Sequence, residues 1–377
     1  MRISVFLLAL VLSACSAGEG QNVVYQPEDG STTPEGDGAV TGDAPEGEVE
    51  EPRDPGPPFD DTLGWKVLDS GEDVAWNVLY GIYNSATDWR FYAGGAMGTV
   101  VWYDGPKAKW HTMDLASSSE VRGIWAAAND YVVVCGEAGL LKRYYDFSGG
   151  GGKPDWYNDD TELSTLAEFE AVSGFDKDHF WAVAKEGIIY QYKEGNWKLW
   201  KTQDIGLIQT PPDLYAVSAL GPTKAAFAGD EMVIFQDGDT FTWNKSDFVG
   251  YKLRSLAVQG GNTYWLGGDK GAVFKLAGGK VEKHQPDSYS HFSALWVAPD
   301  GNVYAAGGKT SAIVWKYDGN AQDQWDFLAV ESPKFINDEF PERIPAQLRL
   351  SGIWGLDDEN IFVTTREKHI IHYAVHP

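Results

Sequence analysis

Residues 171–199 read AVSGFDKDHFWAVAKEGIIYQYKEGNWKL, and this stretch decides the fold. It contains a short apolar strand, a polar turn, a second strand at residues 179–183 and an alternating strand at residues 188–192. Glu194-Gly195 then leads to a strand that opens with Trp197. A two-residue turn with glycine between alternating strands is a strong hairpin signal. The stretch therefore predicts four short strands that pair in chain order.

The same unit recurs along the chain, and the recurrence predicts the architecture. The units have a period of roughly 40–45 residues, which is typical of β-propeller blades. Helical periodicity is absent throughout. The tryptophans recur mainly at equivalent positions of the units, so we expect most of them to pack between blades. The unit starts lie at positions 81, 123, 171, 216, 255, 294 and 352, and the longest insertions at 147–168, 200–213 and 326–349.

The two ends of the repeat array indicate how the ring closes. The seventh unit ends at Pro377 without a fourth strand, whereas a spare strand, Gly64–Leu68, precedes the first unit. That strand has the Trp-led pattern of a fourth strand, so we expect it to pair with Ile370–Tyr373. Closure would also hide the open sheet edges of the array. The sequence thus predicts an all-β, seven-bladed β-propeller over residues 64–377, closed by its N-terminal strand.

Residues 1–14 have the features of an export signal. Arg2 precedes an apolar run, Ile3–Leu12, that is too short to span a bilayer. Leu12-Ser13-Ala14-Cys15 resembles a bacterial lipobox. The resemblance implies a diacylglycerol on the Cys15 thiol, cleavage before Cys15 and acylation of the new N-terminus, which together anchor a protein stably. The alternative is an ordinary signal peptide with an incidental cysteine. In a Gram-negative host, Ser16 favours the outer membrane.

Residues 15–63 are predicted to form a disordered acidic linker. Residues 16–63 contain 13 acidic residues and one basic residue, Arg53. They are also rich in Gly, Pro, Ser and Thr, so they cannot bury enough apolar surface to fold alone. Either a tether that lifts the propeller off the membrane or a merely solubilising linker fits this composition. Because the propeller is also acidic, it is unsuited to binding nucleic acid and suits cations or basic peptides.

Residues 64–377 resemble bacterial surface lipoproteins with kelch-like, WD-like or sialidase-like propeller repeats. Gly123-Ile124-Trp125 and similar elements carry this resemblance, which is architectural. The Gly-His and Trp-Asp dipeptides of WD repeats are missing, and the Asp-boxes of sialidases are matched only imperfectly. A sialidase would need three arginines at the ring centre, and Arg122, Arg254 and Arg349 lie at or just before innermost strands. No Tyr/Glu nucleophile pair can be placed from the sequence.

No catalytic, metal or cofactor motif is found. The chain has no His-Glu-x-x-His, no Gly-x-Ser-x-Gly and no calcium-loop spacing. Asp357-Asp358 and the other acidic runs fit turns, where Asp is favoured for backbone reasons. Cys135 lies in an apolar strand and is predicted to be a small core residue without a disulfide partner. We therefore predict no cofactor, no metal and no enzymatic activity.

The candidate ligand contacts are aromatic residues that fall outside the repeat. They are assigned to connections between a fourth strand and the next blade, which emerge on one face of a propeller, where loops tend to bind ligands. Packing beneath their own loops is the alternative for each. We predict a membrane-anchored monomer that binds a protein, peptide or glycan; the alternatives are an envelope scaffold component and a glycan-active enzyme. The candidates are Trp76, Tyr157, Trp200, Tyr251, Tyr289 and Phe335.

Overall fold

The computed structural model describes most of the predicted propeller and none of the N-terminal 62 residues. The described ranges are 63–145, 154–159, 167–206, 211–286, 291–308, 312–319, 325–329 and 348–375. The predicted export signal, the lipid site at Cys15 and nearly all of the predicted acidic linker lie outside these residues. No helix within the described ranges is long and apolar enough to cross a membrane.

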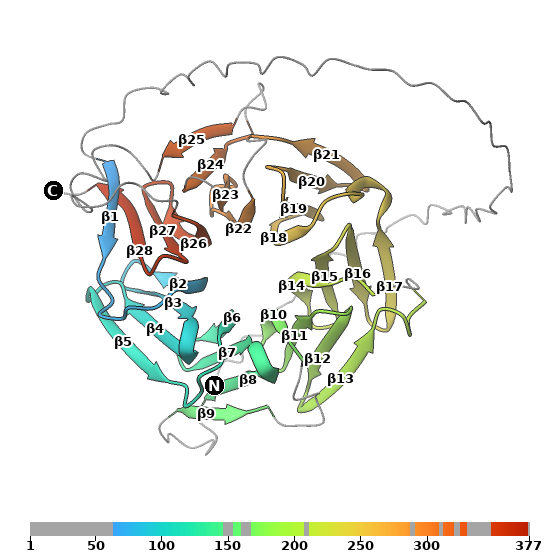
Figure 1. Ribbon diagram of the computed structural model, residues 1–377, viewed down its shortest axis with the longest axis horizontal. Coiled ribbons are helices and arrows are strands. Elements are labelled where there is room, and N and C mark those ends of the chain that lie inside the picture. The colour runs from blue at the N-terminus through green and yellow to red at the C-terminus, as the bar shows by residue number, and fades with distance from the viewer. Residues whose placement is uncertain are drawn as a thin grey trace, which may run out of the picture. The chain divides into compact units, whose positions relative to one another are not determined.

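The described residues form seven antiparallel sheets of four strands each, arranged as a ring (Figure 1). In each sheet the strand that comes first in the unit lies nearest the ring centre, and the fourth lies outermost. Blades 1 to 3 comprise β2 (Trp76–Ser85), β3 (Asp88–Gly95), β4 (Thr99–Asp104) and β5 (Lys109–Asp114); β6 (Val121–Ala128), β7 (Tyr131–Gly136), β8 (Leu141–Tyr145) and β9 (Asp155–Asn158); and β10 (Phe169–Asp176), β11 (His179–Ala184), β12 (Ile188–Lys193) and β13 (Asn196–Lys201).

Blades 4 to 6 repeat this order, and blade 7 uses strands from both ends of the propeller. Blades 4 to 6 comprise β14 (Leu214–Gly221), β15 (Lys224–Gly229), β16 (Met232–Asp237) and β17 (Thr240–Asn244); β18 (Leu253–Gly260), β19 (Thr263–Gly268), β20 (Val273–Ala277) and β21 (Lys280–His284); and β22 (Phe292–Val297), β23 (Val303–Gly307), β24 (Ile313–Tyr317) and β25 (Trp325–Ala329). Blade 7 comprises β26 (Leu350–Asp357), β27 (Asn360–Thr365), β28 (Ile370–Val375) and β1 (Leu63–Leu68).

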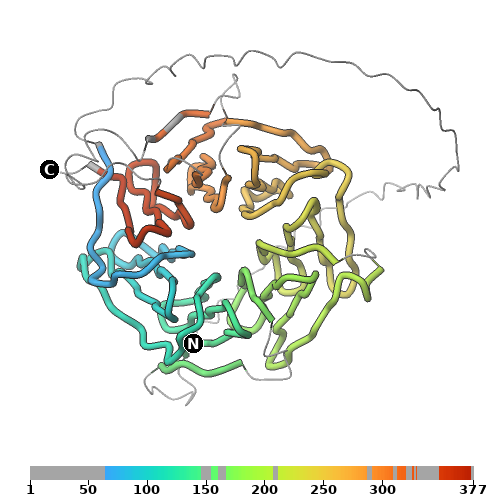
Figure 2. Tube along the Cα trace, viewed as in Figure 1, coloured from blue at the N-terminus to red at the C-terminus, as the bar shows by residue number. Residues whose placement is uncertain are grey.

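The predicted closure of the ring is confirmed. β1 pairs antiparallel with β28, with Trp65 opposite Tyr373 and Leu68 opposite Ile370. The blue N-terminal strand therefore lies beside the red C-terminal strand in Figure 2. The strand begins at Leu63, one residue before the predicted boundary. Because the first and the last strand of the propeller belong to one sheet, their pairing closes the ring.

Tryptophans pack between innermost strands, as the repeat predicts. A Cβ atom built on Gly81 would lie 2.1 Å from the ring of Trp354 in the preceding blade. One built on Gly174 would meet Trp125 at 2.5 Å in the same way. A glycine on one blade thus makes room for a large ring from its neighbour, which brings the innermost strands close together. Cys135 is also in the core, fully buried and free, as predicted.

Candidate functional site

All seven innermost strands contain a β-bulge at the same place. In each, the first residue is buried between blades, and the register with the second strand shifts by one at the next residue. A bulge leaves its extra residue outside the regular pairing and re-aims that side chain. The seven bulge residues are Asn77, Arg122, Glu170, Tyr215, Arg254, Ser293 and Ser351.

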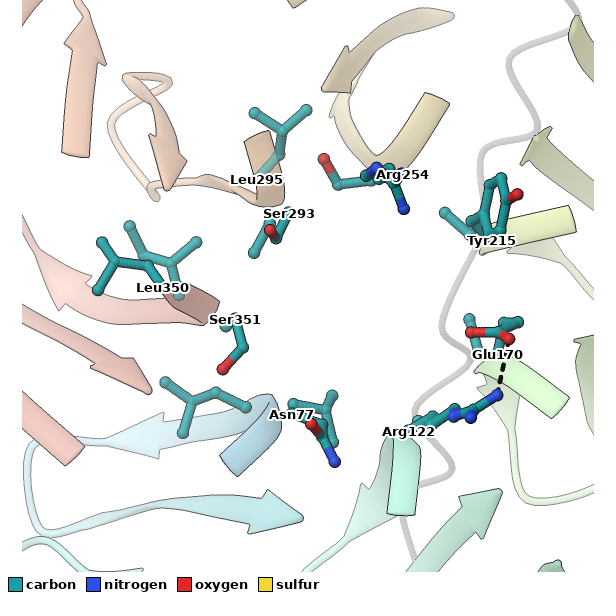
Figure 3. A pocket seen from close by; sticks show the side chains of 18 of the residues that line it. Asn77, Arg122, Glu170, Tyr215, Arg254, Ser293, Leu295, Leu350 and Ser351 are labelled. Carbon is teal, nitrogen blue, oxygen red and sulfur yellow. Dashed lines mark hydrogen bonds and ion pairs between the residues drawn. The ribbon is translucent and has the colours of Figure 1, made fainter. Parts of the chain in front are cut away.

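The bulge residues surround one cavity of about 730 Å³ at the ring centre. Figure 3 shows these side chains around a common opening, each contributed by a different blade. Glu120, His291 and Arg349, which directly precede innermost strands, line the same cavity. We call this the mouth cavity. It lies on the face where fourth strands connect to the next blade, which is the face that the sequence analysis favoured for binding.

One sector of the mouth cavity, in blades 2 and 3, is acidic and internally paired. The guanidinium of Arg122 lies 2.8 Å from Glu170 and 2.5 Å from Glu137, and 3.5 Å from both Glu120 and Glu168. Four carboxylates thus surround one arginine, and Lys185 adds ion pairs to Glu168 and Glu170. The six groups carry a formal charge of −2, although Glu137 and Glu168 do not line the cavity itself.

The ionisation of this sector follows from its burial and pairing. Burial raises the pKa of Glu170 above its ordinary value, although Arg122 and Lys185 oppose that shift. At the exposed Glu168, hydrogen bonding and charge attraction from Lys185 lower the carboxyl pKa instead. Burial alone would lower the pKa of Arg122, but the surrounding carboxylates reverse the effect and raise it. Arg122 is therefore charged and engaged in ion pairs within this cluster.

Three further bulge residues are satisfied by hydrogen bonds within the protein. Asn77 donates from Nδ2 to the carbonyl oxygen of Val121 in the next blade at 3.0 Å. The Ser351 hydroxyl donates to the carbonyl oxygen of Trp76 at 2.7 Å. The Tyr215 hydroxyl donates to Asp230 Oδ1 at 3.2 Å. These contacts fix the positions of the three side chains, and those of Asn77 and Ser351 also link neighbouring blades.

The opposite sector, in blades 5 to 7, retains open donors. Arg254 and Ser293 make no side-chain hydrogen bond or ion pair within the described ranges. Arg366, which lines the cavity in the turn after β27, likewise has no ion pair to any described residue. Arg349 beside it is paired through Nε to Glu367 at 2.8 Å. Among the described residues, this side of the mouth cavity is therefore basic, and the N–H donors of Arg254 and Arg366 make no ion pair there.

None of the four predicted aromatic contacts that the structure describes lines the mouth cavity. Trp76 is fully buried as the first residue of β2 and offers no surface to a ligand. Tyr157 and Trp200 lie within the outer strands β9 and β13, not in connections as predicted. Tyr251 does lie in a connection, where its hydroxyl accepts a hydrogen bond from Lys283 at 2.6 Å. Ligand contact by Tyr157, Trp200 and Tyr251 stays a prediction, and Tyr289 and Phe335 lie outside the described residues.

The three arginines singled out from the sequence do converge. Arg122, Arg254 and Arg349 all line the mouth cavity. Glu170, Tyr215 and the smaller bulge residues were not predicted from the sequence. Each of them directly follows the first buried residue of an innermost strand. Aligning the units from that buried residue would have identified them.

A glycan-active site would place two carboxylates across the cavity from each other. The carboxylates of Glu120 and Glu170 line it, but both contact Arg122 and so lie on the same side. The hydroxyl of Tyr215 contacts Asp230 and Lys252, whereas Glu170 contacts Arg122, so these two cavity residues do not pair with each other. No group of three or more His, Cys, Asp or Glu side chains within the described ranges is arranged to hold a metal ion.

Known proteins resemble this chain in structure but not in sequence. No protein-family profile and no curated protein matches the chain in sequence. Solved structures do match: the WD40 β-propeller domain of Doa1 superposes with a TM-score of 0.62 at 11% identity, covering 83% of this chain and 98% of that one. YCF48 bound to D1 peptide gives 0.61 at 12% identity, covering 85% and 99%.

A third structure, catalytically inactive virginiamycin B lyase from Staphylococcus aureus with quinupristin, gives a TM-score of 0.64 at 8% identity. It covers 83% of this chain and all of that one. The shared feature is the seven-bladed β-propeller. At these identities the likeness shows the fold alone, because one propeller scaffold hosts many unrelated functions.

Proposed function

We propose that this chain is an exported, lipid-anchored envelope protein whose propeller binds a segment of another protein at the mouth cavity, without catalysis. One observation carries the binding role. Seven equivalent backbone positions aim seven side chains at one cavity, and these include charged, aromatic and small polar types. The residues directly before them, which serve packing, are all buried and apolar. Chemical variety at a repeated position indicates recognition, whereas packing needs only similar residues.

The size and setting of the mouth cavity support a ligand. A volume of about 730 Å³ lies within the range of roughly 300–1,000 Å³ that is typical of ligand pockets. The cavity sits on a rigid ring, which keeps the loss of conformational entropy on binding small. A propeller with the same fold, YCF48, was solved bound to D1 peptide, which shows that this scaffold can hold a polypeptide segment. That likeness supports a protein ligand over a glycan.

The arrangement of acidic groups favours binding over glycan hydrolysis. Glu120 and Glu170 are both tied to Arg122 on one side of the cavity, so neither faces an opposing carboxylate. One structural neighbour is a lyase, so the scaffold itself does not decide between the two roles.

Site-specific photo-crosslinking in intact cells tests the binding proposal. A photoreactive phenylalanine analogue replaces Ser293 at the mouth cavity or, as the control, Phe175, which is 53% exposed near the end of β10 on the opposite face. We expect a discrete adduct with another protein from position 293 and none from position 175. An absence of adducts at 293, or the same adduct from both positions, contradicts the proposal.

The anchoring proposal is tested separately at Cys15. We expect the Cys15→Ser variant to lose incorporation of a labelled fatty acid and to leave the membrane fraction, because the acyl chains provide the attachment. Ser13→Ala keeps a small residue in the lipobox and is expected to behave as wild type. Fatty-acid labelling of Cys15→Ser equal to that of wild type would contradict lipidation at this residue.

A further inference from the structure

Two guanidinium groups at the mouth cavity have no anionic partner within the described ranges. They belong to Arg254 and Arg366, and both side chains are exposed. Their situation stands out because the chain has 55 acidic residues against 30 basic ones. Arg122, at the equivalent position of blade 2, is instead surrounded by four carboxylates. Of the four arginines that line the cavity, Arg122 and Arg349 are ion-paired, whereas Arg254 and Arg366 have no anionic partner among the described residues.

The side chain of Arg254 is positioned by an aromatic ring and makes no ion pair among the described residues. Its guanidinium lies 5.5 Å from the ring centre of Tyr215 in the neighbouring blade, a cation–π distance. That ring is fixed by its hydroxyl, which contacts Asp230 at 3.2 Å and Lys252 at 3.4 Å. The contact with the ring face leaves the edge of the guanidinium, which bears the N–H groups, free to donate. Arg254 is thus positioned for a ligand before the ligand arrives.

Arginine in such a setting selects an anionic acceptor. A guanidinium has five N–H donors and no acceptor, and its planar fork matches the two oxygens of a carboxylate. Ser293, in the next blade, adds a hydroxyl that is also without a partner among the described residues. The backbone N–H of Arg366 donates to the carbonyl oxygen of Arg349 at 3.0 Å, so the two arginines of blade 7 stand side by side. Glu367 forms an ion pair with Arg349, whereas Arg366 has no ion pair to a described residue and can bind the ligand.

The other side of the cavity restricts what else the ligand carries. The cavity-lining groups of this sector, Glu120, Glu170, Arg122 and Lys185, sum to zero, and the formal charge of −2 comes from Glu137 and Glu168, which contact Arg122 from outside the cavity lining. The sector would repel a polyanion that fills the cavity and attract a cation. A ligand that satisfies both sectors carries a carboxylate at one end and a positive group some residues away.

We infer that the mouth cavity recognises the C-terminus of a basic polypeptide, with the terminal carboxylate bound by Arg254 and Arg366 and an upstream Lys or Arg facing the acidic sector of blades 2 and 3. The inference rests on the proposed protein-binding function and adds the chemistry of the ligand. A chain end supplies a single carboxylate without further negative charge, which the dipolar cavity requires.

The test uses the whole mature chain, immobilised, and two pools of heptapeptides with randomised neutral and basic residues. One pool ends in a free carboxylate and the other in a carboxamide. We expect the acid pool to be retained at least tenfold more strongly, since a hydrogen bond to a charged group is worth roughly that factor or more. Retained peptides should be enriched in Lys or Arg before the C-terminus. Equal retention of the two pools, or no retention above bare resin, overturns the inference.

Substitutions assign the effect to the named residues. Arg254→Gln and Arg366→Gln should each remove most of the preference for the acid pool, whereas Arg254→Lys should keep part of it because charge remains and the fork is lost. Lys280→Gln, at an exposed position on outer strand β21, changes the net charge equally and should have no effect. Thermal unfolding of each variant checks its folding. An acid preference that survives both Arg→Gln changes overturns the assignment.

The two proposals fail in different ways. Adducts from position 293 together with equal retention of acid and amide pools leave protein binding standing and overturn carboxylate recognition. Selective retention of acid peptides without any cellular adduct supports the chemistry of the cavity and contradicts a protein partner under the growth conditions used. Displacement of bound acid peptides by millimolar inorganic phosphate would mark a general anion site and overturn the inference.

Discussion

Closure of the ring by the N-terminal strand has a measurable energetic consequence at Trp65. Its side chain is only 7% exposed, and its ring centroid lies 4.9 Å from that of Tyr373 on the paired strand β28. It packs in a cluster with Val363 and Ile371 of the same blade. Replacing a buried Trp with Ala typically costs about 3–5 kcal/mol, from lost apolar burial and the cavity left behind. We expect the Trp65→Ala variant to lose stability in that range.

Calorimetric thermal unfolding measures the loss. For a domain of this size, 1 kcal/mol corresponds to roughly 2 °C in Tm, so a decrease of about 6–10 °C is expected. Lys66→Ala is the matched control, because Lys66 is the next residue of β1 and is exposed. Exposed substitutions usually change stability by less than about 0.5 kcal/mol. A Tm for Trp65→Ala equal to that of Lys66→Ala would refute the reasoning that β1 is an integral strand of blade 7.

Three further perturbations probe the packing and electrostatics of the ring. Gly81→Ala would place a methyl group 2.1 Å from the Trp354 ring and should destabilise the propeller by about 1–3 kcal/mol in denaturant unfolding, because the rings must shift. Cys135 should resist thiol reagents at pH 8 until the protein unfolds, since burial is complete and raises the thiol pKa. Burial raises the pKa of Asp358, but hydrogen bonds from Lys316 and its neighbours outweigh this and hold the pKa below its ordinary value. The carboxylate therefore stabilises the fold above about pH 3.9, the unfolded-state value, and its contribution is lost as the pH falls through the lower folded-state pKa. The stability difference between wild type and Asp358→Asn should accordingly shrink on acidification.

A control for the glycine substitution lies at an open position. Gly64→Ala places its methyl group in open space and should leave stability nearly unchanged. Rapid modification of Cys135 in the folded protein would contradict its burial. A pH-independent difference for Asp358→Asn would mean that its ion pair contributes nothing measurable.

Parts of the candidate site could be predicted from the sequence because they follow from position within a unit. Arg122, Arg254 and Arg349 were placed near the ring centre from their position beside innermost strands, and all three line the mouth cavity. The aromatic candidates were chosen by a different criterion: they lie outside the repeat as it was defined from the sequence. In that definition the first unit started at Gly81. The first strand in fact starts at Trp76, so this residue occupies a repeated core position. The error lay in the boundary of the unit, which the apolar pattern alone does not fix.

The sequence by itself determined the number of blades, the order of the strands, the closure by residues 64–68 and the burial of Cys135. These features depend on apolar periodicity, turn residues and the count of strands at each end, all of which are local. Only the tertiary structure decided which side chain of each innermost strand faces the cavity, because a bulge is a shift in register between two paired strands. It also decided that Arg122 is paired with four carboxylates, whereas Arg254 has no ion pair among the described residues. Three of those carboxylates lie 15 to 48 residues from Arg122 in the chain, and they meet it only because neighbouring blades bring the strand ends to one mouth.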